Sequence, residues 1–355
     1  MLSLDPFKVL LPAIVSFIIG IFIAPFIIKI LVKNKIWKKK SVSKSIDGKE
    51  ASITAKIHND EEKKLPRMGG TVVWLSVTIT IALFWLVSHL YPTDITTKLE
   101  FLSRKQTWLP FMAMLVGALV GALDDLLVVE YFNKTGSYIG GGLSFKARFA
   151  AVSLLGLYAG YWFYTKLGID SVYIPFSGDF HLGGVLFIIF FILVTLATFS
   201  TGIIDGVDGL SGGILSAVFT AYGMIAYAHG QIDLAAFCFV VVGGIMAFLW
   251  FNIPPASFQL SETGMLALSL SLSVVAFLTN AVVYLLIIAF PLVITTASVI
   301  LQLFWKKFFK RKLFTVAPLH NHFQAKGWPS YKVSMRYWIV SYICAMLGVI
   351  VTLIS

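Results

Sequence analysis

Charge is scarce in this sequence of 355 residues. Only 13% of the residues are charged and just 17 are acidic, whereas 58% are hydrophobic and the mean hydropathy is +0.87. Because an average soluble domain carries about 25% charged residues, this composition excludes an ordinary soluble protein and indicates a polytopic membrane protein. Cysteine is nearly absent as well. Cys238 and Cys344 both lie inside apolar runs, which excludes a disulfide framework.

The start of the sequence lacks the short apolar stretch and small-residue cleavage site of a signal peptide. Its first apolar stretch is long and is flanked by Lys29 and Lys33, which predicts a retained helix. The formal net charge of +11 would indicate nucleic-acid binding in a soluble protein. Here the basic residues are concentrated between apolar stretches, so we expect a lipid bilayer and no nucleic acid as partner.

Ten segments have the roughly 20 apolar residues that a helix needs to cross a bilayer. They predict an all-α polytopic integral membrane protein of about ten transmembrane helices, organised as a single transmembrane domain over residues 1–355. The division between the eighth and ninth segments, at Thr279-Asn280, is the least distinct. The segments are 8–34, 70–91, 108–129, 145–167, 183–202, 210–228, 233–253, 263–280, 281–305 and 333–354.

The distribution of basic residues predicts the orientation. Of the 28 Lys and Arg residues, eleven lie from Lys33 to Arg67 and eight from Lys306 to Arg336. By the positive-inside rule these regions are cytoplasmic, which places both termini outside. The loop at 92–107 is then external although it carries three basic residues, which are far fewer than those in the two cytoplasmic regions. Residues 171–181, SVYIPFSGDFH, have β-branched and aromatic residues around a Ser-Gly turn, which indicates a small external β-hairpin. The cytoplasmic loops are then 35–69, 130–144, 203–209, 254–262 and 306–332.

Five acidic residues converge on the cytoplasmic edge of the predicted bundle. Asp124 and Asp125 end the third span, Asp205 and Asp208 connect the fifth to the sixth, and Glu262 precedes the eighth. Because carboxylates at membrane depth are costly, they are functional-site candidates by default. The alternative is a set of solvated boundary residues, but the glycines and basic residues around them favour a site.

The pairing of acids points to a particular chemistry. Adjacent carboxylates such as Asp124 and Asp125 repel each other, and Mg²⁺ relieves this through one or two carboxylates plus substrate phosphates. The absence of thiolates and of a compact His motif argues against zinc. The cluster therefore favours phosphoryl or phosphoglycosyl transfer between a soluble nucleotide and a lipid. An ion-coupled transporter is the alternative, although its acids usually lie near the bilayer midplane.

The last cytoplasmic loop, FTVAPLHNHFQAKGWPSYKVSMRYW at 314–338, carries two histidines. His320 and His322 flank Asn321. In a basic loop opposite an acidic cluster, such a pair favours phosphate or pyrophosphate binding over a structural role. The surrounding basic residues are Lys306, Lys307, Lys310, Arg311, Lys312 and Lys326.

Six motifs, in this order and with ten spans, resemble the polyprenyl-phosphate N-acetylhexosamine-1-phosphate transferases. The resemblance covers most of the chain. IIDGVDG also looks superficially like the motif of CDP-alcohol phosphotransferases, but the Ala-Arg and the two further spaced Asp residues of that motif are missing. The six motifs are PRMGG (66–70), ALDDL (122–126), GLSFKARF (142–149), IDGVDGLSGG (204–213), FLWFNIPPA (248–256), and APLHNH with the following GWP, Lys332 and Arg336-Tyr337-Trp338.

The resemblance implies Mg²⁺-dependent transfer of phospho-MurNAc-pentapeptide from UDP-MurNAc-pentapeptide to undecaprenyl phosphate, giving lipid I and UMP for peptidoglycan synthesis. It also implies a bacterial cytoplasmic (inner) membrane location with the active site facing the cytoplasm, and a homodimer. Carried over by motif, the catalytic residues are Asp124, Asp125, Asp205 and His320, and the metal ligands are Glu262 and Asp125. The implied substrate-binding residues are Asp208, Asn252, Lys134, Lys146, Arg148, His322 and Arg67.

Several departures from the family pattern leave the sugar nucleotide open. The family's magnesium-binding Asp is Glu262 here, and the middle histidine of its triple is Asn321. The amides that precede its Asp-rich motif are missing from residues 199–204. Arg67 replaces a usual Thr, as in the branch that transfers GlcNAc-1-phosphate. UDP-GlcNAc or a related sugar nucleotide is therefore the alternative substrate.

Overall fold

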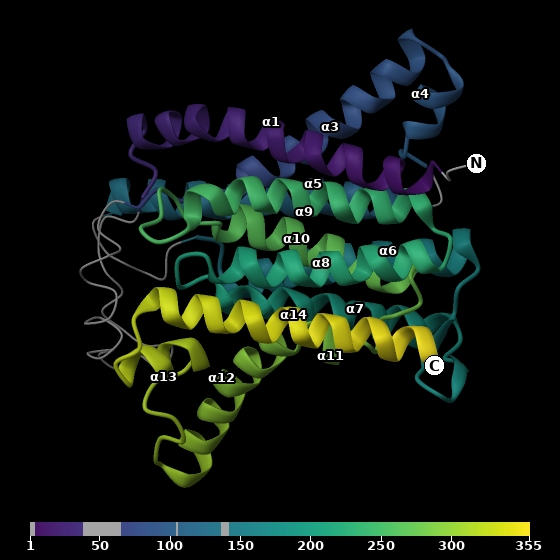
Figure 1. Cartoon of the computed structure of the whole chain (residues 1–355). Coiled ribbons are helices and arrows are strands. Elements are labelled where there is room, and N and C mark those ends of the chain that lie inside the picture. Colours follow the sequence, from purple (N-terminus) through teal and green to yellow (C-terminus); the bar gives the residue numbers. More distant parts are fainter. Residues whose placement is uncertain (1–3, 38–64, 104–105, 136–141) are drawn as a thin grey trace.

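The computed structural model describes residues 4–37, 65–103, 106–135 and 142–355. These residues form a bundle in which most long helices run along one common direction (Figure 1). The helices are α1 (Asp5–Lys33), α3 (Gly70–Leu90), α4 (Asp94–Leu99), α5 (Trp108–Thr135), α6 (Phe145–Trp162), α7 (Gly184–Ser200), α8 (Leu210–Ala228), α9 (Ile232–Asn252), α10 (Ser261–Leu278), α11 (Leu285–Ile288), α12 (Phe290–Phe309), α13 (Leu319–Ala325) and α14 (Ser330–Ile354).

The predicted helical membrane architecture is confirmed. Within the described ranges, nine helices are long and apolar enough to cross a membrane. The tenth long helix is α6, whose first turn carries Lys146 and Arg148. Its continuation, Phe163–Leu167, is a π-helical turn that ends at Gly168.

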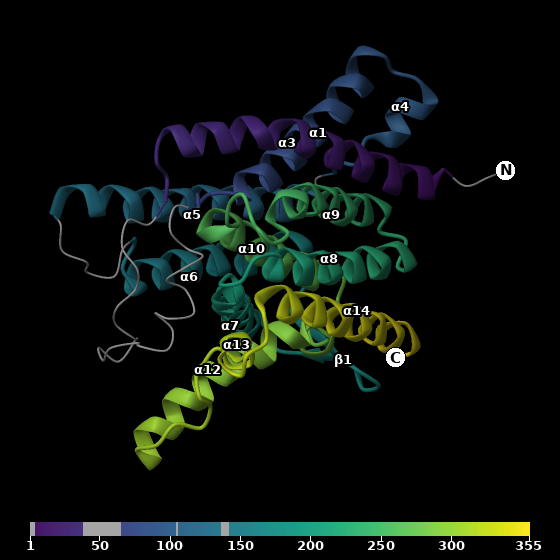
Figure 2. The same ribbon diagram turned by 60° about the vertical axis from the view of Figure 1, so that its left-hand side comes forward.

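The ninth span begins later than expected. After α10 the chain turns through Asn280, whose φ of 54° lies in the left-handed region that Asn tolerates. The short helix α11 follows, and α12 starts only at Phe290. Pro291 lies in the first turn of α12, where its missing N–H costs no helical hydrogen bond. As a result α12 runs obliquely to the rest of the bundle (Figures 1 and 2).

The predicted hairpin at 171–181 is also confirmed. Strand β1 (Ser171–Ile174) pairs antiparallel with β2 (Gly178–His181), and Ser171 lies opposite His181. The hairpin lies near the C-terminus, where the Tyr173 hydroxyl donates to the backbone oxygen of Ser355 at 2.5 Å. Both termini lie at one end of the bundle and α13 lies at the other (Figure 1).

The centre of the bundle contains α8, α9 and α10, most of whose side chains are buried. Helix α5 packs against α10 through a Gly-x-x-x-Gly pair, Gly117 and Gly121. A Cβ on Gly121 would lie 2.2 Å from the carbonyl oxygen of Glu262, so only glycine permits this approach. The close contact places Asp124 and Asp125, one turn farther along α5, beside the start of α10.

Candidate active site

Asp125 is fully buried and its carboxylate is saturated with hydrogen bonds. Its Oδ1 accepts from Arg67 Nε at 3.0 Å and Nη2 at 2.8 Å. Its Oδ2 accepts from Ser261 Oγ at 2.6 Å and from the backbone N–H and hydroxyl of Thr263 at 3.0 and 2.6 Å. A carboxylate offers about four lone-pair positions, so Asp125 has none left for a ligand and instead joins three segments of chain.

The PRMGG motif delivers Arg67 to this position by pairing with the segment before α10. The Gln259 N–H donates to the Pro66 carbonyl at 2.8 Å, and the Gly69 N–H donates to the Gln259 carbonyl at 2.7 Å. A Cβ on Gly69 would collide with the Phe258 ring, which explains the glycine. Burial, the largest single influence, lowers the pKa of Arg67, but the charge and hydrogen bonds of Asp125 together with the charges of Glu262 and Asp205 raise it overall, so Arg67 stays cationic.

Asp124 and Glu262 share a second guanidinium, that of Arg148. The Arg148 Nη1 lies 3.1 Å from Glu262 Oε1, and its Nε lies 3.8 Å from Asp124 Oδ1. Asp124 Oδ1 also accepts the backbone N–H of Leu143 at 2.6 Å. Gly142 has a φ of +101°, and a Cβ there would lie 2.6 Å from that oxygen. About a quarter of each of the Arg148 and Glu262 side chains is exposed, whereas the Asp124 side chain is 2% exposed, so a ligand reaches this half of the cluster through Arg148 and Glu262.

Asp205 connects the loop before α8 to the same cluster. Its Oδ1 accepts from Ser211 Oγ at 2.7 Å and its Oδ2 from the Ser261 N–H at 2.7 Å. Burial raises the pKa of Asp205 even though both hydrogen bonds lower it. Ser261 therefore bonds Asp205 through its backbone and Asp125 through its hydroxyl, and its φ of 54° is the strained conformation that allows both.

Asp208 and Asn252 hold this loop in place. Asp208 Oδ2 accepts the Ala256 N–H at 3.2 Å. The buried Asn252 accepts the Gly209 N–H at 2.8 Å and donates to the Phe258 carbonyl at 2.7 Å. The Asn252 amide oxygen and nitrogen are thus both bonded to backbone, so this side chain links the loop before α8 to the segment before α10.

The histidine loop meets the Asp205–Asp208 loop. His320 in α13 is buried, and its Nε2 lies 3.2 Å from the point that a Cβ on Gly206 would occupy. Helix α14 contacts the same loop, because Trp338 Nε1 donates to the Gly209 carbonyl at 2.8 Å. His322 is only partly buried, and its pKa is lowered by burial and by Lys326.

The remaining sequence-predicted residues lie at the margin of the cluster or beyond it. Lys146 is exposed in the first turn of α6. Lys134 belongs to the last turn of α5, and its side chain lies outside the described residues. The structure thus brings together Arg67, Asp124, Asp125, Arg148, Asp205 and Glu262, with Asp208, Asn252 and His320 in the adjoining loops.

Of the two predicted metal ligands, Glu262 is placed to bind a divalent cation and Asp125 is not. In the part of the chain that the structure describes, no group of three or more His, Cys, Asp or Glu side chains is arranged to hold a metal. Glu262 fits such a role together with Asp124, because both carboxylates already face the one cation of Arg148. Two carboxylates completed by substrate phosphates suit Mg²⁺. Asp125 does not fit, since its oxygens are saturated.

Comparison with known proteins identifies the family. The family model described as Glycosyl transferase family 4 matches residues 107–280. A phospho-N-acetylmuramoyl-pentapeptide transferase of Listeria welshimeri is 33% identical over 347 residues, which is 96% of each chain. The chain belongs to this family. Proteins of the same name from Levilactobacillus brevis (32% identical, 83% of this chain and 86% of the relative) and a Geobacillus species (31% identical, 96% of each) agree.

As a member of glycosyl transferase family 4, the protein is a membrane-embedded phosphoglycosyl transferase that acts on a polyprenyl phosphate and a sugar nucleotide. Family motifs point to the acids and histidines, but they did not reveal the roles of Ser261 and Thr263. The residues lie on either side of Glu262 in the SET sequence at 261–263. The two hydroxyl groups are visible in the sequence and could have indicated hydrogen bonds to a nearby carboxylate. The backbone turn at Ser261, which directs these groups toward Asp125, has no signature in the sequence.

Proposed function

We propose that the protein transfers phospho-MurNAc-pentapeptide from UDP-MurNAc-pentapeptide to undecaprenyl phosphate, releasing UMP and forming lipid I. The observation that carries this proposal is the 33% identity, over 96% of both chains, to the phospho-N-acetylmuramoyl-pentapeptide transferase of Listeria welshimeri. An oxygen of undecaprenyl phosphate attacks the phosphorus attached to the sugar. The bond from that phosphorus to the bridging oxygen breaks, and UMP leaves with the electron pair.

In this proposal the adjacent acids have different tasks. Asp124 faces Arg148, whose side chain is about a quarter exposed, so it orients or deprotonates the attacking lipid phosphate. Asp125 is a positioning residue, because all its contacts are with Arg67, Ser261 and Thr263. Arg148 attracts the substrate phosphates, whose oxygens compete with carboxylates for a guanidinium. Asp205, Asp208 and His320 line the loops that adjoin the cluster, where we place the nucleotide. His322 and Lys146 lie at the margin.

Mg²⁺ is the cofactor proposed for this site. Glu262 and Asp124 would hold it together with oxygens of the pyrophosphate. When bound, the ion neutralises charge that develops as the pyrophosphate breaks. This assignment keeps Glu262 from the motif-based prediction and replaces Asp125 with Asp124, since only the latter is positioned to accept a cation.

The alternative substrate is UDP-GlcNAc or a related sugar nucleotide. Arg67 favours it, because an arginine at this motif position is similar to the GlcNAc-1-phosphate branch, and here its guanidinium closes one side of the acidic cluster. Membership in a family of phosphoglycosyl transferases argues against an ion-coupled transporter. The basic loops and the relatives support a cytoplasmic-membrane location with the active site facing the cytoplasm, which belongs to the proposal, and the homodimer stays a prediction.

The experiment compares sugar nucleotides on the purified full-length protein. It is incubated with undecaprenyl phosphate, Mg²⁺ and either UDP-MurNAc-pentapeptide or UDP-GlcNAc, and lipid-linked products and UMP are measured. We expect lipid I and an equal amount of UMP. A lipid-linked GlcNAc product without lipid I would overturn the proposal in favour of the alternative.

A further inference from the structure

Two residues next to the acidic cluster have an unusual backbone conformation and are bonded to each other. Met68 has a φ of 66° and Ser261 a φ of 54°, both in the left-handed region that favours glycine. The Met68 N–H donates to Ser261 Oγ at 2.7 Å. In the described part of the chain, the other non-glycine residues with positive φ follow a helix or turn the hairpin, where this conformation is common. They are Lys35, Phe176, Asn280 and Lys310.

This contact, which we term the Met68–Ser261 clasp, joins two segments whose backbones also pair. The Gly70 N–H donates to the Leu260 carbonyl at 3.1 Å. A Cβ on Gly70 would lie 2.2 Å from the Cα of Gly264, so the two backbones are in direct contact. Left-handed backbone at a serine and a methionine costs free energy and persists only where the surrounding contacts enforce it. Conformations of this kind are concentrated at active sites, where they hold functional groups in place.

Ser261 donates a hydrogen bond to each of two carboxylates. Its backbone N–H donates to Asp205 at 2.7 Å and its hydroxyl to Asp125 at 2.6 Å. The two acids come from different elements, Asp205 from the loop before α8 and Asp125 from α5. Carboxylates bonded to one residue lie close enough to repel each other, and the donors between them offset this repulsion. The Ser261 oxygen accepts the Met68 N–H, which leaves the hydroxyl hydrogen for Asp125.

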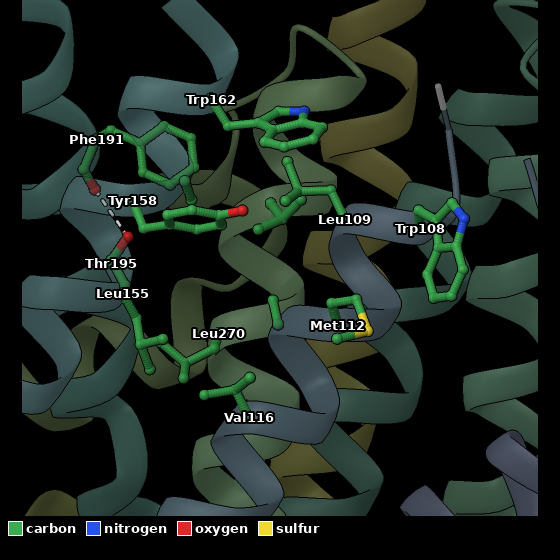
Figure 3. Close-up of a pocket in the computed structure, with 13 residues that line it drawn as sticks. Trp108, Leu109, Met112, Val116, Leu155, Tyr158, Trp162, Phe191, Thr195 and Leu270 are labelled. Atoms are coloured by element: carbon green, nitrogen blue, oxygen red, sulfur yellow. Dashed lines mark hydrogen bonds between the residues drawn. The ribbon is translucent and has the colours of Figure 1, made fainter. Parts of the chain in front are cut away.

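The acidic turn of α5 depends on this donor because α5 is packed mainly from one side. Toward α6, its side chains line a largely apolar groove of about 460 Å³ that separates the two helices (Figure 3). Toward α10, Gly117 and Gly121 bring the two backbones into contact. The hydrogen bonds at the start of α10 therefore fix the position of the acidic turn of α5, which carries Asp124 as well as Asp125.

Ser261 is placed to orient these acids and not to contact a substrate. The residue is 5% exposed, and its hydroxyl both accepts and donates a hydrogen bond within the protein. Arg67 and Thr263 also donate to Asp125. Among the hydrogen bonds of the described residues, however, only those of Ser261 connect Asp125 to Asp205 through one residue. Ser261 is therefore the point at which the two acids are held relative to each other.

We infer that Ser261 is a positioning residue for the transfer reaction, whose hydroxyl fixes Asp125, and with it Asp124, relative to Asp205. The inference rests on the proposed function, because it takes Asp124 and Asp205 as groups that act on the substrates. The left-handed backbone directs the N–H and the hydroxyl of one residue toward two acids. The protein is thereby less stable at Ser261 than a relaxed backbone would make it, and it gains a defined spacing between the acids.

The test separates the hydroxyl from the backbone strain with two substitutions at one position. Ser261→Ala removes the hydroxyl and keeps a side chain that disfavours positive φ, whereas Ser261→Gly removes the hydroxyl and relieves the strain. The purified full-length protein is assayed for UMP release with Mg²⁺ and both substrates, and its Tm is measured in detergent. We expect kcat to fall about tenfold or more in both variants, because a misplacement of about 1 Å suffices for such a loss. Tm should be about 2 °C higher for Ser261→Gly than for Ser261→Ala.

The Michaelis constants and a matched control distinguish positioning from substrate contact and from a general loss of structure. KM for both substrates should stay within about twofold of wild type, as expected for a residue that contacts neither. Ser269→Ala removes another buried hydroxyl of α10, which donates to the Leu266 carbonyl, and should leave kcat unchanged. A normal kcat in Ser261→Gly, a kcat that rises with Tm from Ser261→Ala to Ser261→Gly, or a raised KM at unchanged kcat would overturn the inference.

Amide hydrogen exchange tests the clasp without turnover. Exchange of the backbone N–H groups at 66–70 and 259–264 is followed by mass spectrometry in the full-length wild type, Ser261→Gly and Ser269→Ala. We expect faster exchange in Ser261→Gly alone, because the Met68 N–H loses its acceptor and the pairing of the two segments loosens. Equal exchange in the three proteins would contradict the inference. If the wild type transferred no sugar phosphate from any sugar nucleotide while exchange followed this pattern, the proposed function would fail and the clasp would stand.

Discussion

The ion pair between Arg67 and Asp125 gives the sharpest prediction about how the active site is held together. Replacing Arg67 with Met removes both guanidinium hydrogen bonds, at 3.0 and 2.8 Å, and leaves a fully buried carboxylate. Breaking one partner of a buried pair costs about 3–5 kcal/mol. Because Ser261 and Thr263 still donate to Asp125, we expect the lower end, about 3 kcal/mol.

Thermal unfolding in detergent at one fixed scan rate measures this loss. A change of about 3 kcal/mol corresponds to a fall in Tm of about 4 °C in a chain of this size. The double variant Arg67→Met/Asp125→Asn removes the stranded charge together with its partner. It should therefore be more stable than Arg67→Met alone, with a coupling between the two sites of at least about 1 kcal/mol.

Lys146→Met is the matched control, because it removes one positive charge from an exposed side chain. Surface substitutions of this kind change stability by no more than about 0.5 kcal/mol. If Arg67→Met unfolded at the same temperature as Lys146→Met, Arg67 would not be the structural partner of Asp125. A double variant less stable than the single one would refute the reasoning as well.

Three further predictions concern the same cluster. Asp124→Asn should lower kcat by roughly 10²-fold or more, as expected for loss of a general base, with Tm close to wild type; a near-normal kcat would remove Asp124 from the chemistry. Glu262→Gln should raise the Mg²⁺ concentration needed for half-maximal activity while Glu262→Asp preserves activity, and identical Mg²⁺ titrations for all three proteins would exclude Glu262 as a ligand. Gly121→Val should separate α5 from α10, since even a Cβ would lie 2.2 Å from the Glu262 carbonyl oxygen; we expect lost activity and a Tm lowered by several degrees, and unchanged Tm would contradict the close packing.

The helical architecture could be predicted because hydrophobic runs and basic loops report directly on the membrane. The spans, the hairpin at 171–181 and the grouping of the acids at one end all follow from patterns in the chain. The start of α12 at Phe290 could not be placed, because residues 281–289 are as apolar as the helix that follows them. The break there depends on a turn at Asn280 that a hydrophobic run conceals.

The membership of the acidic cluster could be predicted, but the division of labour within it could not. Asp124 and Asp125 are adjacent and identical in the sequence, yet successive positions on a helix point about 100° apart. One therefore faces Arg148 and the other faces Arg67. The predicted substrate contact of Asn252 stays a prediction, but the sequence does not indicate that its amide also bonds two backbone groups. These differences arise from tertiary contacts, such as Arg67 with Asp125 and Gly209 with Asn252, which lie 58 and 43 positions apart in the sequence.

The central claim is that an acidic cluster at one end of α5, α6 and α10 catalyses sugar-phosphate transfer to a lipid, with Asp124 in the chemistry and Asp125 in its support. The most direct measurement is UMP release with UDP-MurNAc-pentapeptide, undecaprenyl phosphate and Mg²⁺ by wild type, Asp124→Asn and Arg148→Gln. The account predicts stoichiometric UMP and lipid I from wild type and severe loss in both variants while they remain folded. Turnover by Asp124→Asn at the wild-type rate would contradict it.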